Sequence, residues 1–251
     1  MTPIRRVLAV AHDNSGSRLL FENVSKAFPE IEFGLAITEG LYYRKTALQS
    51  VMKLVRESSI IFCAVRAFDL FLYKMGRDTL ANKVKRDGLF SFRTRDINDV
   101  QSVASAREFA PDLILSLYTM HIYRAEFIAI APLGGIGTHP SIFPDYRGLE
   151  VFFWAMVNNE PTIGVSVFKT EVKVDSGKVL NEAVLPLDPK QPMNSVYRMI
   201  TEKAADLLIK SIREIGSDSV TYRIPEGEGR YFPMPTREAV WKFIRLGKRF
   251  F

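Results

Sequence analysis

The sequence predicts an α/β protein whose open, mostly parallel sheet is flanked by helices, and three observations support that class. Apolar runs of strand length alternate with segments of helical periodicity along the chain. The run PDLILSLY at 111–118 is continuously apolar, which is typical of a parallel strand covered on both faces. Four polar or glycine-rich turns follow predicted strands, at 12–17, 118–123, 137–148 and 171–177. Because ligands of open α/β sheets bind outside the strand ends, we expect these turns to surround one cleft.

The elements of the first half are assigned from their hydrophobic spacing. Leu20 and Val24 recur at helical spacing after the first strand, whereas 31–38 alternates and carries β-branched residues. Asp96 or Asn98 is placed to cap a later helix, because short polar side chains accept the first free amides of a helix. The predicted elements are a strand at 5–13, a helix at 17–28, a strand at 31–38, a long helical region at 45–75, a short strand at 88–94, a helix at 95–109 and a strand at 111–118.

The second half contains the most regular amphipathic helix, at 192–215. Its predicted buried stripe consists of Val196, Ile200, Ala204, Leu207, Leu208 and Ser211. The other predicted elements are a strand that leads into His139, a helix at 150–159, strands at 162–170 and 178–187, and a helix at 236–251 that Thr236 caps. Before this last helix, a loop rich in glycine and proline marks a change in the character of the chain.

Composition narrows the class of protein. Apolar residues make up 47% and charged residues 25%, as in globular domains. The single cysteine, Cys63, excludes a disulfide framework and a cysteine-based zinc site and favours a reducing compartment, so we expect a cytoplasmic protein. The apolar run at the start of the chain is too short for the core of a signal peptide. The net charge of +6 predicts an anionic partner, without choosing among a phosphorylated metabolite, a polyglutamate, a nucleic acid and a lipid surface.

Two apolar segments each have two interpretations. The run 60–73 is interrupted by Arg66 and Asp69 and is shorter than the roughly 20 residues of a membrane span, so we expect a helix packed in the core. A face for a partner or a membrane surface is its alternative. The basic helix at 236–251 is expected to pack on the domain, with binding to nucleic acid or a membrane as the alternative. Its predicted packing residues are Val240, Phe243 and Ile244.

Several familiar motifs are absent from the chain. It has no G-x-G-x-x-G, G-x-x-x-x-G-K-[ST], H-E-x-x-H or G-x-S-x-G sequence, so dinucleotide, Walker-type, zinc-peptidase and serine-hydrolase chemistry lack support. No metal is expected, because the three histidines lie far apart in the sequence. The turn 14–17 is a candidate anion site, since its amides would lie at the amino terminus of a helix.

The segment GGIGTHPSIFPDYRG at 134–148 sets a histidine in unusual surroundings. Pro140 keeps the backbone at His139 extended, and the glycines before it let the chain approach a ligand closely. Asp175 lies in a turn after the neighbouring predicted strand and could face His139. A carboxylate beside an imidazole orients it and favours its protonated form, which suits a proton relay or an oxyanion stabiliser. A structural histidine and a turn aspartate are the alternative.

These motifs together resemble the core of the folate-dependent formyltransferases, the superfamily of glycinamide ribonucleotide, methionyl-tRNA and amino-sugar N-formyltransferases. The resemblance covers residues 88–187 well, the first strand loosely and residues 40–85 poorly. It is carried by His139-Pro140-Ser141, Phe143-Pro144, Tyr146-Arg147-Gly148, Trp154-Ala155, Ile163-Gly164-Val165 and Asp175-Ser176-Gly177. It implies a Rossmann-like, formyltransferase-like catalytic domain at 1–215, followed by a basic C-terminal extension at 216–251.

The resemblance also implies a reaction and its residues. 10-Formyltetrahydrofolate would be the co-substrate, and the amine of an acceptor would attack its formyl carbon without help from a metal. His139 would stabilise the oxyanion or carry the proton, and Asp175 would orient His139 and assist proton transfer. The implied folate-binding residues are Met120, His121, Ile122, Tyr123, Glu171, Val172, Lys173 and Val174. The expected acceptor-binding residues are Asn14, Ser15, Gly16, Ser17 and Ser141.

Gly137 departs from the family pattern, which has an asparagine two residues before the histidine. The loss of such an oxyanion donor costs roughly 2.7–4 kcal/mol in other oxyanion holes. Thr138, the amide of Gly137 or a water molecule could replace it in part. Three functions therefore stay open: an N-formyltransferase, a formyltetrahydrofolate hydrolase, and a catalytically impaired binding module.

The first of these functions is the expected one. Its acceptor would be the amine of an amino sugar, an amino acid derivative or a ribonucleotide, phosphorylated or not. The tRNA enzyme is less expected, because few residues follow 215. We expect no membrane span. We also expect no nucleic-acid partner, apart from the alternative given for the basic tail. A homodimer is possible.

Overall fold

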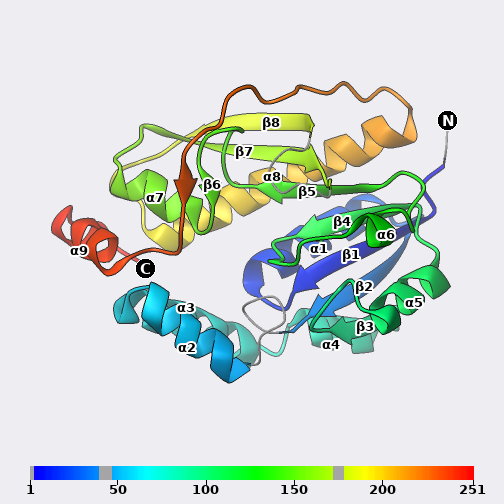
Figure 1. Ribbon diagram of the computed structural model, residues 1–251, viewed down its shortest axis with the longest axis horizontal. Coiled ribbons are helices and arrows are strands. Elements are labelled where there is room, and N and C mark those ends of the chain that lie inside the picture. The colour runs from blue at the N-terminus through cyan, green and yellow to red at the C-terminus, as the bar shows by residue number, and fades with distance from the viewer. Residues whose placement is uncertain (1–2, 40–46, 172–177) are drawn as a thin grey trace.

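The computed structural model describes residues 3–39, 47–171 and 178–251, which form a seven-stranded sheet with helices packed against it (Figure 1). The strands lie in the order β3-β2-β1-β4-β5-β7-β8. The first five are parallel, and β7 and β8 continue the sheet antiparallel at one edge. The strands are β1 (Arg6–His12), β2 (Glu32–Thr38), β3 (Ser91–Thr94), β4 (Leu113–Leu117), β5 (Gly135–His139), β7 (Thr162–Lys169) and β8 (Val179–Pro186). The predicted class, an open and mostly parallel α/β sheet, is confirmed.

The sheet is buried on both faces because its central strands are apolar throughout. Val7 and Ala9 of β1 belong to one core cluster, and Leu8 and Val10 belong to a second cluster on the opposite face. The first cluster packs beneath α1 (Ser15–Ala27), α7 (Val151–Val157) and α8 (Met193–Gly216). The second packs beneath α5 (Val100–Phe109) and α6 (Ala125–Ile128). The stripe predicted for the helix 192–215 is buried at all six positions, which confirms it.

Some predicted boundaries are wrong, and local chemistry explains them. The helical region 45–75 is two helices, α2 (Ala47–Glu57) and α3 (Ile60–Met75), and a further helix, α4 (Leu80–Asp87), follows them. Neither Asp96 nor Asn98 caps α5, because the carboxylate of Asp96 accepts the amide of Asn98 in a turn before the helix. Asp99 is the cap and accepts the amide of Ser102 at 2.6 Å. The strand predicted at 111–118 ends at Leu117, because Tyr118 adopts a left-handed conformation with φ of 50°.

The C-terminal residues lie against the main body. β6 (Arg147–Gly148) pairs with β9 (Tyr231–Phe232), and α9 (Arg237–Arg245) packs on α7, where Phe243 stacks on Phe153. Thr236 caps α9 as predicted. Val240 and Phe243 are buried, but Ile244 is exposed because it lies on the outer side of the helix. The boundary between a catalytic domain and an extension at 215 stays a prediction.

The prediction that the run 60–73 packs in the core is wrong for most of α3. Among the described residues of this helix, only Phe62 is fully buried. One stripe of α3 lines the cavity and consists of Phe62, Arg66, Asp69, Leu70 and Tyr73, and Val65 packs against the core. Beyond this stripe, the exposed large apolar side chains of the helix are Ile60, Ile61, Phe68, Phe71, Leu72 and Met75. Within the ranges described, no helix combines the length and the apolar character needed to cross a membrane.

Candidate functional site

A cavity of about 320 Å³ opens at the carboxyl ends of β1, β4 and β5. Its walls come from the turn after β1, the segment after β4, the end of β5, the turn between β6 and α7, and the inner sides of α2 and α3. Three of the four turns predicted to surround one cleft meet here. The fourth, 171–177, lies outside the described residues except for Glu171.

His139 is the last residue of β5 and lines the cavity with its ring held in two ways. Its Nε2 lies 2.8 Å from the carbonyl oxygen of Tyr146. A carbonyl can only accept, so Nε2 carries the hydrogen and the neutral ring has its lone pair on Nδ1. The imidazole also stacks on Phe143, with ring centroids 4.9 Å apart and planes at 11°. The ring therefore has a fixed orientation and a defined tautomer.

The carbonyl of Tyr146 is itself held by the C-terminal part of the chain. Tyr146 adopts a left-handed conformation with φ of 54°, and its ring stacks on Phe232 of β9 at 4.6 Å. The guanidinium of Arg230 hydrogen-bonds to the neighbouring Asp145 and lowers the pKa of that carboxyl to about 2. The hydroxyl of Tyr146 donates to Glu160. Arg230 and Phe232, which follow residue 215, therefore hold in place the segment whose carbonyl orients His139.

Gly137 lies between Ser116 of β4 and Phe168 of β7, where a side chain would require these neighbours to shift by a few tenths of an ångström. A Cβ at this position would lie 3.1 Å from the Cβ of Ser116 and 3.3 Å from the Cζ of Phe168. Gly137 does not line the cavity, whereas its neighbour Thr138 does. Asp175, expected beside His139, falls outside the described residues, as do Val172, Lys173 and Val174.

The predicted folate-binding residues separate into two groups. Met120 and His121 line the cavity. The carbonyl of Ile122 accepts from the side chain of Asn98 at 2.9 Å, and Tyr123 is buried with its hydroxyl donating to Ser116. Glu171 is exposed and is not part of the wall.

The predicted acceptor-binding residues also divide. Asn14 and Ser15 line the cavity, and Asn14 caps α1 by accepting the amide of Ser17 at 2.9 Å. Ser17 donates its hydroxyl to the carbonyl of Leu117, and a Cβ on Gly16 would lie 2.0 Å from the hydroxyl oxygen of Tyr197. Gly16 and Ser17 therefore serve the packing of α1. Ser141 is buried as well and donates to the carbonyl of Asp145 at 2.9 Å.

Three charged residues in the wall were missed by the sequence analysis. Arg66 of α3 lies with Nη2 3.3 Å from Oε1 of Glu150 and Nη1 3.4 Å from Oδ2 of Asp69, and its guanidinium covers the ring of Tyr197. Glu150 has a left-handed backbone conformation with φ of 49°. Its Oε2 is buried and has no hydrogen-bond partner among the described residues. The charges that interrupt the apolar run 60–73 were the available signal for Arg66 and Asp69.

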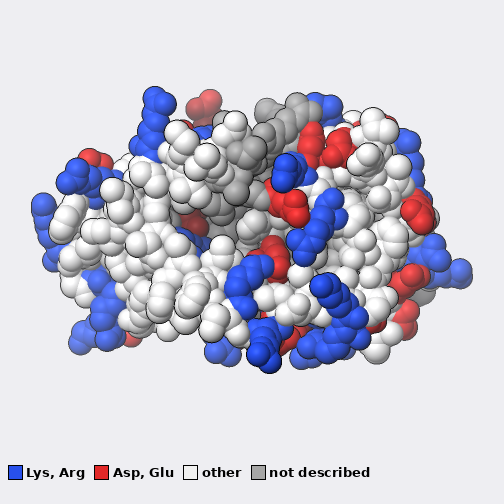
Figure 2. Space-filling view, turned by 90° about the horizontal axis from the view of Figure 1, so that it is seen from below, with Lys and Arg blue, Asp and Glu red and all other residues white. Residues whose placement is uncertain are grey.

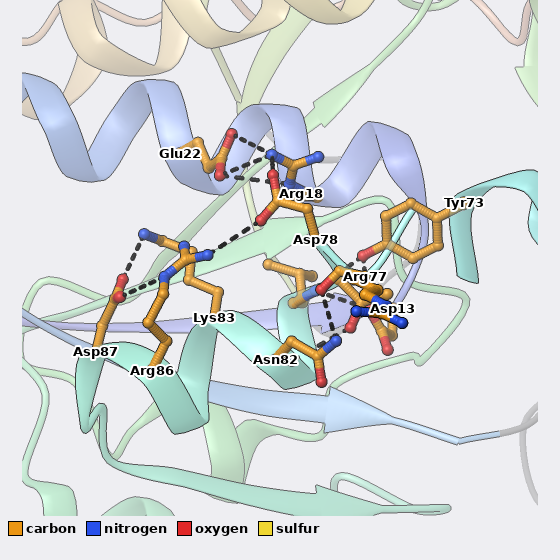
Figure 3. Close-up of polar contacts among 12 residues, drawn as sticks. Asp13, Arg18, Glu22, Tyr73, Arg77, Asp78, Asn82, Lys83, Arg86 and Asp87 are labelled. Carbon is orange, nitrogen blue, oxygen red and sulfur yellow. Dashed lines mark hydrogen bonds and ion pairs between the residues drawn. The ribbon is translucent and has the colours of Figure 1, made fainter. Parts of the chain in front are cut away.

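A polar network holds the end of α3 and the start of α4 on the turn after β1 (Figure 3). Asp13 accepts from the hydroxyl of Tyr73 at 2.7 Å and from the amide of Leu80 at 3.0 Å, and it pairs with Lys74. Burial works against the charge of Asp13, but the hydrogen bonds from Lys74 and Tyr73 hold its pKa below the ordinary value. Arg18 pairs with both Glu22 and Asp78. The network fixes α3 as a wall of the cavity.

His121 is expected to make the stability of the protein depend on pH. Burial lowers the pKa of His121 to about 4, and its Nδ1 accepts the amide hydrogen of Ile97. The unfolded chain therefore binds a proton at higher pH than the folded chain does, so acid favours unfolding. We expect His121 to contribute a fall of about 2–3 kcal/mol in the free energy of unfolding as the pH drops from about 6.5 to 4.

The variant His121→Asn tests this, because its amide oxygen can still accept from Ile97 but does not titrate. Urea unfolding of both proteins across that pH range should give a shallower dependence for the variant. Identical pH dependences would show that His121 is not the source. His12, whose pKa burial also lowers, is present in both proteins and cancels in the difference.

The fold and the site define a class of protein. The open, mostly parallel α/β sheet is the fold that the formyltransferase resemblance implies, and His139 lies at the end of β5 beside a cavity of small-molecule size. The sequence model of the Formyl transferase family matches residues 51–212, more than half of the chain, and the chain belongs to that family.

Known relatives agree with this membership. The chain is 30% identical to a methionyl-tRNA formyltransferase of Roseiflexus castenholzii over 150 residues, 58% of this chain and 48% of that protein. It spans about half the length of the curated relatives it matches. A sugar N-formyltransferase of a Shewanella species superposes with a TM-score of 0.59 at 17% identity, over 91% of this chain and 76% of that one. An N-formyltransferase of Helicobacter canadensis, in complex with folinic acid and dTDP-3-aminofucose, superposes with a TM-score of 0.59 at 14% sequence identity. The match covers 94% of this chain and 72% of that one. At these identities the structural likeness concerns the fold.

Proposed function

We propose that this protein is an N-formyltransferase that moves the formyl group of 10-formyltetrahydrofolate to the amine of a small acceptor. One observation carries the proposal. The imidazole of His139 is fixed at the end of a central strand, beside the cavity, with its tautomer set by the carbonyl of Tyr146. An imidazole whose orientation is fixed, with Nε2 donating to a carbonyl, is suited to acid–base chemistry at its other ring nitrogen.

His139 is proposed to transfer one proton during the reaction. When an amine attacks the formyl carbon, the nitrogen must lose a proton and the carbonyl oxygen gains negative charge. The neutral ring can accept that proton at Nδ1, and the resulting cation can then donate from Nδ1 to the oxyanion or to the departing folate nitrogen. Asp175 is proposed to orient the imidazole and to favour this cation.

The wall formed by α3 and the turn before α7 suits a polar, amine-bearing acceptor. The buried Oε2 of Glu150 is an acceptor for a hydrogen bond from an amine or an ammonium group. Arg66 pairs with the other oxygen of this carboxylate at 3.3 Å and leaves Oε2 available to an acceptor substrate. An amino sugar, an amino acid derivative or a ribonucleotide amine would each meet these groups.

Folate binding is supported by Met120 and His121 in the cavity wall and by the folinic acid in the Helicobacter canadensis structure. The cavity, at about 320 Å³, lies within the range of small-molecule sites. Because the side chain of Tyr123 and the carbonyl of Ile122 have other partners, the folate contacts are proposed to lie at 120 and 121 and in the segment 171–175.

Calorimetric titration with a stable analogue of 10-formyltetrahydrofolate tests the proposal. The wild-type protein should bind the analogue with a micromolar dissociation constant, and Asp175→Ala should weaken binding about tenfold by removing a charged hydrogen-bond partner. Asp188→Ala is the matched control, because Asp188 is exposed and bonds only locally to the amide of Lys190. A folded wild-type protein that does not bind would overturn the folate proposal. Binding without transfer to any amine would favour the hydrolase or the binding module.

A further inference from the structure

The outer sides of α2 and α3 carry large apolar side chains that no other part of the described chain covers. On α2, Leu48 is 71% exposed and Met52 is 64% exposed, and on α3, Ile60 is 71%, Phe71 is 56% and Met75 is 66% exposed. These side chains recur at helical spacing, so each helix presents a stripe. We call this surface the apolar face. A monomeric protein rarely leaves such contiguous apolar surface in water, which marks an interaction site.

The apolar face continues onto the C-terminal residues. Phe251 packs edge-to-face on Phe68 of α3 with ring centroids 5.6 Å apart, and the turn between α2 and α3 bonds to the carbonyl of Pro235, just before α9. Trp241 and Leu246, in and directly after α9, are also exposed. The surface therefore combines two amphipathic helices, a third short helix and the chain end.

Basic side chains accompany the apolar face. Arg56 lies on α2, Lys242 and Arg245 lie on α9, and Arg249 follows it, all of them exposed. Within the described residues none of these four has an ion-pair partner. In the view from below, the half of the surface on the side of α2 and α3 has few charged side chains, and its margin carries mainly lysine and arginine with some acidic side chains between them (Figure 2).

We infer that the apolar face docks on an anionic lipid bilayer, an interaction that goes beyond formyl transfer and does not depend on it. Helices with apolar side chains on one side and lysine, arginine and tryptophan beside them bind in the plane of the membrane interface. Each basic residue near the surface adds electrostatic attraction to anionic lipids. A second copy of this chain fits less well, because a twofold contact through this face would bring like-charged margins together.

The inner sides of the same two helices line the cavity. Leu54 of α2 and Phe62, Arg66 and Leu70 of α3 are part of its wall. A protein docked through the outer sides would therefore hold the cavity within one helix diameter, about 10 Å, of the bilayer surface.

Flotation with lipid vesicles tests the inference. Wild-type protein should float with vesicles of phosphatidylcholine and phosphatidylglycerol, bind much less to pure phosphatidylcholine, and lose affinity as salt is added. Met52→Glu and Phe71→Glu should each weaken binding to the mixed vesicles about tenfold or more, because each removes an apolar side chain that would enter the bilayer and adds a negative charge. The control is Val100→Glu, on α5, where Val100 is 85% exposed and a carboxylate suits the start of a helix.

Several outcomes would overturn the inference. These are no flotation of the wild type, equal binding to charged and neutral vesicles, or unchanged binding of Met52→Glu and Phe71→Glu. If the wild-type protein does not bind vesicles but light scattering shows a dimer, and if Phe71→Glu is a monomer, the apolar face would be assigned to contact with a second copy of the chain. Because flotation does not depend on folate, its failure is distinct from a failure of the proposed transferase activity.

Discussion

Replacing His139 with alanine should lower the turnover of formyl transfer by about 10²–10⁴-fold, the usual contribution of a positioned acid–base group. Affinity for the folate analogue should change little, since the proposed folate contacts lie elsewhere in the cavity. The loss should therefore appear in kcat rather than in the binding constant. Single-turnover kinetics with saturating folate, together with calorimetry, separates the two quantities.

His139→Gln separates proton transfer from positioning. Glutamine can donate a hydrogen bond to the carbonyl of Tyr146, as Nε2 of His139 does, but it cannot accept and return a proton near neutral pH. We expect it to be as inactive as alanine but more stable to heat. Recovered activity in the glutamine variant would show that His139 only holds the loop, and a large fall in melting temperature for both variants would indicate a structural role.

The second large effect is expected at Gly148, where alanine should lower the free energy of unfolding by about 3–5 kcal/mol. A Cβ at this position would lie 2.0 Å from the carbonyl oxygen of Phe232, and the backbone there has φ of 110°. The same carbonyl accepts the amide of Leu149, so the side chain would separate β6 from β9. Because this pairing supports Tyr146, folate-dependent activity should fall together with stability.

Gly227→Ala is the matched control for Gly148→Ala. Gly227 also has a positive φ, of 85°, but no atom lies within 4 Å of its added Cβ. Denaturant unfolding of both variants separates the cost of backbone strain from the cost of the steric clash with Phe232. For Gly227→Ala, we expect the free energy of unfolding to fall by only about 1 kcal/mol. Equal losses at the two positions would mean that the contact between β6 and β9 contributes little.

Much of the fold could be predicted because its central elements follow simple periodicities. The stripe of α8 and the apolar strands β1 and β4 each have a pattern that one secondary structure explains. Predicted boundaries were wrong where more than one nearby side chain could cap a helix. At the start of α5, Asp96 accepts the amide of Asn98 in a turn, and Asp99 caps the helix instead. Such choices depend on the surrounding chain more than on residue type.

The candidate site was harder to predict, because it joins segments that are distant in the sequence. His139 was found from its motif, but its partner is a backbone carbonyl, which no residue type reveals. Arg66 and Glu150 are 84 positions apart in the sequence and form an ion pair because the fold brings α3 next to the turn before α7. The apolar run 60–73 was assigned to the core because composition reports hydrophobicity but not which side of a helix the protein covers.

Gly137 has a consequence for how this sequence can change. Its neighbours Ser116 and Phe168 occupy the space into which a side chain at 137 would grow. Asparagine, the usual residue of the family here, would require these two side chains to give way by a few tenths of an ångström. The effect of a side chain at 137 on stability therefore depends on which residues stand at 116 and 168. Substitutions at the three positions should show coupled rather than additive effects on stability, so laboratory evolution toward the common family sequence should alter them together.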